Sequence, residues 1–226
     1  MKRLISSISI YLLLSSTVFL LSCETDSYDK GEGTYSNMVA EFAEMRSDAA
    51  KRGVSFETDE GVNYILNKSY TASWMTKGDS TYRTAIYYNK VEEGIASLLS
   101  VSNILTIVPR KASSFKKQTQ DPAGMESCWV SKKGKYFNVG LLLKNGRDAN
   151  GKEGIHGLAI MYDGTYENAD HTKTAYYRLL HDKGNTPEYY TNRRFISILL
   201  PESNRPDSVR LTVRTYEGDV SKTLKI

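Results

Sequence analysis

The chain has 226 residues, of which 40% are hydrophobic and 25% are charged, with a formal net charge of +4. This composition is typical of a globular protein and excludes a disordered, collagen-like or coiled-coil chain. The near-neutral charge argues against a surface that follows nucleic-acid phosphates, so no nucleic-acid partner is expected. No motif specifies a reaction. We therefore expect a protein that is not an enzyme, with no catalytic residues, no cofactor and no metal site.

The N-terminus has the pattern of a bacterial lipoprotein. Lys2 and Arg3 precede an apolar stretch over residues 4–21, which is the charged and then hydrophobic pattern of a secretory signal. The stretch runs into the tetrapeptide LLSC at residues 20–23, which resembles the lipobox whose cysteine receives diacylglycerol and becomes the first residue after cleavage. An uncleaved membrane-spanning helix is the alternative. The serines in the stretch and the polar residues after Cys23 disfavour it, so Cys23 is the predicted lipidation site.

The mature protein is expected to be a soluble body on a lipid tether. Removal of residues 1–22 as a signal peptide takes away two basic side chains and leaves a balance of +2. Residues 23–33 contain the lipidated cysteine and an acidic, glycine-rich spacer that is too polar to be buried. Each CH2 group of an acyl chain that is buried in the bilayer contributes roughly 0.8 kcal/mol of binding free energy, so the acyl chains would hold the protein on a membrane. The expected location is the outer membrane. Glu24 and Asp26 are too few to decide between a periplasmic and a surface-facing protein.

The body of the chain alternates apolar and polar residues with frequent turns, which predicts an all-β fold. Residues 41–52 form only a partial helical stripe, so we expect a strand followed by a loop or a short helix. Residues 54–57 and 62–67 are expected to form a hairpin whose turn contains Gly61. Together with the strands that follow, these segments predict an OB-like β-barrel over residues 34–109.

Residues 81–91 are the longest strand candidate of the first half. Because side chains alternate across a strand, Tyr82, Ile86 and Tyr88 share one face, and Tyr87 lies on the other.

The second half of the chain predicts a separate sandwich domain. Residues 110–124 are polar and basic and contain a proline, so they are expected to be an interdomain linker. Residues 125–226 contain seven strand candidates, at 125–131, 135–144, 155–162, 174–181, 194–200, 208–216 and 220–226. This number of strands in about 100 residues predicts an immunoglobulin-like β-sandwich.

Several motifs resemble those of the NigD-like lipoproteins. They are TASW at 71–74, DSTYR at 79–83, YYNKV at 87–91, WVSK at 129–132, HDKG at 181–184 and PEYY at 187–190. The resemblance covers nearly the whole mature chain, although the connection at 46–53 is longer and richer in alanine than the family pattern. It implies a lipidated N-terminus, an N-terminal OB-like barrel and a C-terminal β-sandwich. The motifs are structural, so they imply fold more strongly than function.

Few single residues have chemistry that could define a site. Cys128 is the only thiol left once Cys23 is acylated, and it is expected to be an inert, buried strand residue. His156, His171 and His181 are far apart in the sequence. The loops at 147–153 and 163–170 contain oxygen ligands, but neither has the EF-hand spacing.

Tyrosine is the one unusual feature of the composition, with 16 Tyr against 6 Phe. Trp74, Tyr82, Tyr87 and Tyr88 are the candidate ligand-binding residues, because aromatic rings on a barrel can stack on sugars. Alternatively, these rings are structural and stay partly wet at the surface of a thin β domain.

Three functions remain open at this stage. The first is a non-catalytic binding or scaffolding lipoprotein with an envelope protein as its partner. The second is a glycan-binding lipoprotein that takes up polysaccharide at the cell surface. The third, implied by the family resemblance alone, is a bacteriocin-associated immunity or protection protein.

Overall fold

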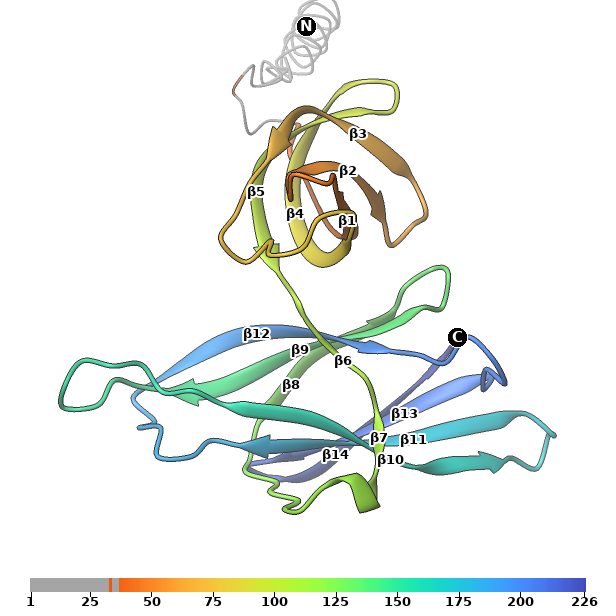
Figure 1. Ribbon diagram of the computed structural model, residues 1–226. Helices are drawn as coiled ribbons and strands as arrows, with labels where there is room; N and C mark the ends of the chain where they lie inside the picture. The colour runs from red at the N-terminus through yellow and green to blue at the C-terminus, as the bar shows by residue number, and fades with distance from the viewer. Residues whose placement is uncertain (1–32, 34–36) are drawn as a thin grey trace, which may run out of the picture. The chain divides into compact units, whose positions relative to one another are not determined.

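The computed structural model describes Gly33 and residues 37–226, which form strands β1 to β14 and one short 3₁₀ helix, η1 (Ala112–Ser114) (Figure 1). The predicted all-β fold is confirmed. The predicted signal peptide, Cys23 and, except for Gly33, the tether lie outside the described residues. In the part of the chain that the structure describes, no helix is long and apolar enough to cross a membrane.

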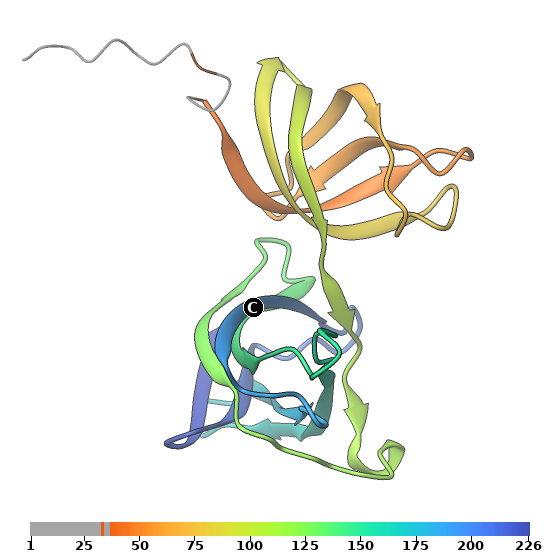
Figure 2. The same ribbon diagram turned by 90° about the vertical axis from the view of Figure 1, so that its left-hand side faces the viewer.

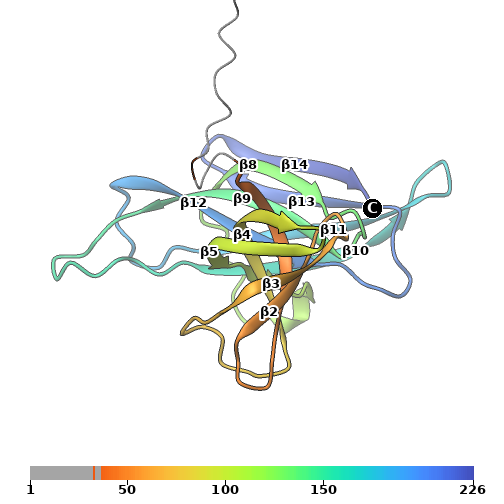
Figure 3. The same cartoon turned by 90° about the horizontal axis from the view of Figure 1, so that it is seen from above.

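Strands β1 to β5 close a barrel in the order β1-β2-β3-β5-β4, with β4 returning to β1. They are β1 (Val39–Ser47), β2 (Gly53–Thr58), β3 (Asn63–Tyr70), β4 (Thr81–Glu92) and β5 (Ile95–Asn103). Figure 3 shows β4 and β5 side by side, as their antiparallel pairing requires. The β3–β5 pair alone is parallel. A five-stranded barrel of this kind is OB-like, so the predicted barrel is confirmed.

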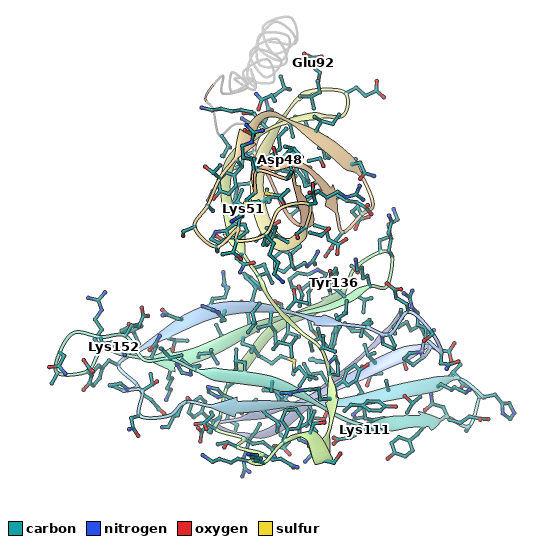
Figure 4. The ribbon with its side chains drawn as sticks, viewed as in Figure 1. Asp48, Lys51, Glu92, Lys111, Tyr136 and Lys152 are labelled. Carbon is teal, nitrogen blue, oxygen red and sulfur yellow. The ribbon has the colours of Figure 1, made fainter. Side chains whose placement is uncertain are left out.

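The first connection of the barrel is a turn, and residues 41–52 contain no helix. Asp48 closes the turn by accepting hydrogen bonds from the Arg52 backbone N–H at 2.8 Å and from its guanidinium at 2.9 Å. Lys51 takes a positive φ of 65° in this turn. Figure 4 labels both Asp48 and Lys51. The predicted hairpin is also present, because β2 pairs with β3 around Gly61 at φ 84°.

The sandwich consists of two sheets with strand orders β14-β13-β11-β10-β7 and β6-β12-β9-β8. Its strands are β6 (Leu105–Ile107), β7 (Arg110–Lys111), β8 (Gly124–Val130), β9 (Tyr136–Asn145), β10 (Gly157–Glu167), β11 (Lys173–Asp182), β12 (Tyr190–Leu199), β13 (Ser208–Thr215) and β14 (Gly218–Lys225). All seven strands expected between residues 125 and 226 are present. The predicted β-sandwich is therefore confirmed.

The boundary between the two domains lies earlier than the sequence predicts. The chain leaves the barrel at Ile104, and the next residues pair with the sandwich as β6, parallel to β12, and β7, parallel to β10. Figure 2 shows this stretch running on from β5 as one extended segment. Residues 105–109 therefore belong to the sandwich and not to the barrel, and residues 110–111 are strand and not linker. The error arises because the apolar run at residues 98–108 supplies core residues to both domains.

The sheet that contains β9 has one face in the sandwich core and one face toward the barrel. On β9, Phe137, Val139 and Leu141 are completely buried in the core, while Tyr136 and Asn138 alternate with them and contact barrel residues. Residues 38–226 form one compact unit that includes both domains. The contacts on this outer face position the candidate site.

Candidate functional site

Arg83 of β4 joins the barrel to the sandwich through a buried polar network. Its guanidinium donates to the two carboxylate oxygens of Asp59 at 2.6 and 2.7 Å, to Ser197 Oγ at 3.0 Å and to Asn138 Oδ1 at 3.0 Å. The Arg83 side chain is 3% exposed, and its guanidinium lies over the Tyr136 ring, 4.1 Å from the centroid. A buried arginine held by three partners fixes its geometry closely.

A second polar contact between the domains lies beside this network. Glu44 of β1 accepts hydrogen bonds from Lys135 Nζ at 2.6 Å and from the hydroxyl of Tyr136, which is labelled in Figure 4. Burial raises the pKa of Glu44, but these two hydrogen bonds outweigh it and hold the pKa below its ordinary value. Glu44 is therefore a carboxylate at neutral pH, and it holds the two domains together.

Aromatic rings form the apolar part of the same contact. The ring centroids of Phe42 and Trp129 are 5.1 Å apart, those of Phe42 and Phe195 5.4 Å, and those of Trp129 and Phe195 6.1 Å, all edge to face. A cleft of about 460 Å³ lies next to them. It is lined by Ala40, Glu41, Phe42, Asp59, Glu60, Ala85, Ile86, Tyr87, Trp129 and Phe195. We call it the aromatic cleft.

The pairing of β1 with β4 explains why this surface is hollow. Ala40 is paired with Tyr87, and Phe42 is paired with Ala85, so each large ring lies opposite a methyl group. Cross-strand neighbours on one face lie roughly 4.5–5.5 Å apart at Cβ, so two large rings in either pair would fill the space. The small partners leave an opening between the rings of Phe42 and Tyr87.

Carboxylates supply the charged groups of the aromatic cleft, and among the residues that the structure describes no lysine or arginine lines it. Asp59 is neutralised by Arg83. Glu41 accepts a hydrogen bond from the Tyr88 hydroxyl at 3.1 Å. Glu60 forms an exposed ion pair with Lys132 at 3.3 Å. The cleft therefore offers ring faces and hydrogen-bond acceptors, with no cation to attract an anionic ligand.

The four aromatic residues predicted from the sequence do not form one platform. Tyr87 is 41% exposed and lines the aromatic cleft. Tyr88 is only 1% exposed and packs in the barrel core, so its prediction as a ligand-binding residue is wrong. Trp74 and Tyr82 pack edge to face at 5.6 Å against the barrel core. The Tyr82 hydroxyl is also engaged, since it donates to the Lys77 carbonyl at 2.8 Å.

Sequence reasoning missed Phe42, Trp129 and Phe195. The available signal was strand alternation, because Trp129 and Phe195 alternate with Cys128 and Ile196, which pack in or against the sandwich core. A large ring on the face opposite a core residue must find a second surface to cover it. Alternation does not show that this surface is the barrel.

The structure places the single described cysteine and the three histidines outside the lining of the aromatic cleft. Cys128 is half-buried against the sandwich core, and burial raises the pKa of its thiol. The His171 ring lies 2.8 Å from Glu167 at the surface, whereas His156 and His181 stack on each other. Within residues 37–226 and Gly33, no group of three or more His, Cys, Asp and Glu side chains is placed to hold a metal ion.

Solved structures with this fold exist, although no family model and no curated protein matches the sequence. A NigD-like immunity protein from Bacteroides caccae is 17% identical with a TM-score of 0.62, over 81% of this chain and 91% of that one. A candidate toxin-related protein from Parabacteroides distasonis is 14% identical with a TM-score of 0.62, over 84% and 93%. A candidate lipoprotein from Bacteroides fragilis is 12% identical with a TM-score of 0.57, over 84% and 97%.

This chain shares their fold. The NigD-like resemblance drawn from the sequence motifs is confirmed at the level of the fold, including the succession of barrel and sandwich. At these identities the likeness concerns architecture, and the function rests on the site.

Proposed function

We propose that the protein is a non-catalytic, lipid-anchored binding protein of the outer membrane and that the aromatic cleft is its ligand site. One observation carries the proposal: Phe42, Tyr87, Trp129 and Phe195 come from four strands of two domains and surround one hollow. Its volume of about 460 Å³ is in the range of small-ligand sites, roughly 300–1,000 Å³. Sites on strands are held more accurately than sites on loops.

A neutral polysaccharide is the ligand that the lining favours. The apolar faces of sugar rings stack on aromatic side chains, and sugar hydroxyls donate to a carboxylate such as that of Glu60. An anionic polysaccharide would meet carboxylates, and no lysine or arginine of the described lining would bind it. An envelope protein as the partner is the alternative.

Filling the aromatic cleft tests this assignment. We expect Ala85→Trp, which places a ring opposite Phe42, to weaken retention on a neutral polysaccharide by about tenfold, since one or two lost ring contacts are worth about 1.4 kcal/mol. Tyr87→Ala should weaken it similarly. Affinity electrophoresis in gels that contain a panel of neutral polysaccharides measures this. Tyr166→Ala, which removes an exposed ring outside the cleft, is the control.

Two results would contradict the proposal. If the wild-type protein is retained by no polysaccharide, the glycan ligand is wrong and an envelope protein becomes the leading partner. If the folded Ala85→Trp variant is retained like the wild type, the ligand binds elsewhere. Thermal melts of each variant separate loss of binding from loss of fold.

The anchor is tested separately at Cys23. We expect Cys23→Ala to move the protein from the membrane fraction to the soluble fraction, because the acyl chains supply the membrane affinity. Protease treatment of intact cells then determines which side the wild-type protein faces. Cleavage supports a surface-facing protein that meets polysaccharide from outside, and protection until the outer membrane is opened favours a partner inside the envelope. A Cys23→Ala protein that remains in the membrane would contradict lipidation.

Immunity or protection is the second candidate function. It is favoured by the fold shared with the NigD-like immunity protein of Bacteroides caccae. Deleting the gene should then sensitise cells to a toxin of neighbouring bacteria, and complementation with Ala85→Trp should fail if the aromatic cleft is involved. Unchanged sensitivity of the deletion strain would count against this function.

A further inference from the structure

A second cavity, of about 450 Å³, lies at one end of the sandwich. It is lined by Leu105, Leu143, Asn145, Glu153, Gly154, Ile155, His156, Leu158, Asn192, Arg193 and Arg194. These residues come from β6, β9, β10 and β12 and from the loop at 146–156, whose Lys152 is labelled in Figure 4. We call it the end cavity.

The end cavity contains a histidine whose hydrogen-bonding role can be derived. His181 Nδ1 lies 3.0 Å from the carbonyl oxygen of Asp121, which can only accept, so this nitrogen carries a proton. In the neutral ring, His181 Nε2 is then an acceptor. His156 Nδ1 lies 2.8 Å from it and must be the donor. In the neutral pair, His156 Nε2 is therefore unprotonated and can only accept a hydrogen bond.

This acceptor has no donor in the described structure. His156 Nε2 is buried and makes no hydrogen bond with any described residue. A buried polar atom without a partner is uncommon in native proteins and calls for one from a ligand or water. Because His156 lines the end cavity, the missing donor can enter through it.

Arg194 is the second unusual residue of the end cavity. On β12 it alternates onto the face of Ile196 and Ile198, which point into the sandwich core. No hydrogen bond or ion pair joins Arg194 to another of the residues the structure describes. Its neighbour Arg193 lies on the opposite face, where its guanidinium donates to Glu126 at 2.5 Å. Arg194 thus lines the cavity without a partner among the described residues, and its guanidinium is a group suited to a carboxylate.

The remaining lining is apolar or already satisfied. Glu153 Oε1 accepts hydrogen bonds from Asn145 Nδ2 at 3.0 Å, Asn192 Nδ2 at 3.2 Å and the Tyr190 hydroxyl at 3.3 Å. Leu143 and Leu158 provide an aliphatic floor.

The loops around the end cavity are held firmly together. A Cβ on Gly154 would overlap Thr186, and one on Gly146 would lie 2.8 Å from the Tyr189 ring. The loops at 146–156 and 183–189 therefore pack closely against each other. Their close packing preforms the wall of the cavity, which lowers the entropic cost of binding.

We propose that the end cavity binds a small carboxylate that carries a neighbouring N–H donor and an aliphatic body, the chemistry of an aliphatic amino acid or of the C-terminal residue of a peptide. The carboxylate pairs with Arg194, the N–H donates to His156 Nε2, and the aliphatic group lies on Leu143 and Leu158. This site is separate from the aromatic cleft and does not depend on its function.

Four probes test the chemistry by calorimetric titration of the full mature chain. L-leucine and N-acetyl-L-leucine both carry a carboxylate and an N–H donor. Tighter binding of L-leucine would indicate a free amino acid as the ligand, and tighter binding of N-acetyl-L-leucine would indicate the C-terminus of a peptide. L-leucinamide lacks the carboxylate, and 4-methylpentanoate lacks the N–H. Each should bind about tenfold more weakly than the better of the first two, since a hydrogen bond to a charged or buried group is lost.

Matched variants test the residues. Arg194→Gln should weaken binding of the better probe by about tenfold or more, whereas Arg46→Gln, at an exposed arginine of β1 outside the end cavity, should change it by less than about twofold. His156→Leu should also weaken it. Ala85→Trp, in the aromatic cleft, should leave it unchanged, so failure here is distinguishable from failure of the proposed function.

The pH dependence of binding adds a readout specific to the histidine. Burial, His181 and Arg194 lower the pKa of His156, while Asp121 and Glu188 oppose the shift. Binding should therefore hold at neutral pH and decline only below about 6.5, once Nε2 is protonated and becomes a donor. No saturable binding of either leucine probe to the wild-type protein would overturn the proposal, as would wild-type binding by folded Arg194→Gln.

Discussion

Replacing Arg83 by alanine is expected to lower the free energy of unfolding by about 3–5 kcal/mol. The change leaves the Asp59 carboxylate, whose side chain is 16% exposed, without its buried partner. It also removes the hydrogen bonds from the guanidinium to Ser197 and Asn138. Because these residues lie in both domains, we further expect the barrel and the sandwich to unfold in separate transitions. Urea unfolding followed by tryptophan fluorescence and circular dichroism measures both effects.

Two controls isolate the buried ion pair. Arg46→Ala removes an exposed arginine of β1 that lies 3.8 Å from Glu57, and it should cost less than about 1 kcal/mol. Arg83→Met combined with Asp59→Asn removes both charges, and it should be less destabilising than Arg83→Ala alone. If Arg83→Ala proves as mild as Arg46→Ala, the network does not hold the domains together.

The polar network illustrates what the sequence cannot provide. Period-two alternation places Arg83 on the β4 face opposite Ile86, which alone suggests a solvent-exposed arginine. Asp59 lies in a turn, and Asn138 and Ser197 alternate with core residues, so each has the pattern of a surface residue. Only the contact of one domain with the other brings these residues together. No local pattern encodes that contact.

The positions of the strands were easier to predict from the sequence than the domain boundary. Alternation and turn residues predict each of the long strands of the sandwich, because each buries one face. The residues of β6 were assigned to one apolar run of the barrel, and β7 was missed, since two or three residues at a parallel sheet edge show no period. Pro109 lies between them and has no N–H to donate, which gives this stretch the pattern of the end of a strand.

The sequence predicted one residue of the aromatic cleft, Tyr87, as a ligand-binding candidate and none of the end cavity. Tyr87 was a candidate from the sequence and lines the aromatic cleft, whereas the other three rings of the cleft were not candidates. Alternation grouped Tyr82, Ile86 and Tyr88 on one face of the strand, but it did not identify the core face, because Ala85 and Val91 are apolar members of the face of Tyr87. The histidine pair needs the register of β10 with β11, which places His181 opposite Leu158, two residues after His156.

Tyr88→Ala and Tyr87→Ala form the second pair of expected results, because adjacent tyrosines on one strand should behave in opposite ways. Tyr88 is 1% exposed, its ring lies 5.0 Å from that of Phe56 and 5.2 Å from that of Tyr64, and its hydroxyl donates to Glu41. Its truncation should cost about 3–5 kcal/mol through the cavity left in the barrel. Tyr87 is 41% exposed, so its truncation should cost less than about 1 kcal/mol.

Polysaccharide retention should depend on Tyr87 and not on the hydroxyl of Tyr88. Tyr87→Ala is expected to weaken polysaccharide retention by about tenfold while its melting temperature stays close to that of the wild type. Tyr88→Phe keeps the ring in the core and removes only the hydroxyl, so it should retain both the fold and the ligand, with a stability loss of about 1 kcal/mol from the hydrogen bond to Glu41. Retention lost in Tyr88→Phe but kept in Tyr87→Ala would mean that the ligand enters the barrel interior, and the aromatic cleft would then be a structural contact between the two domains.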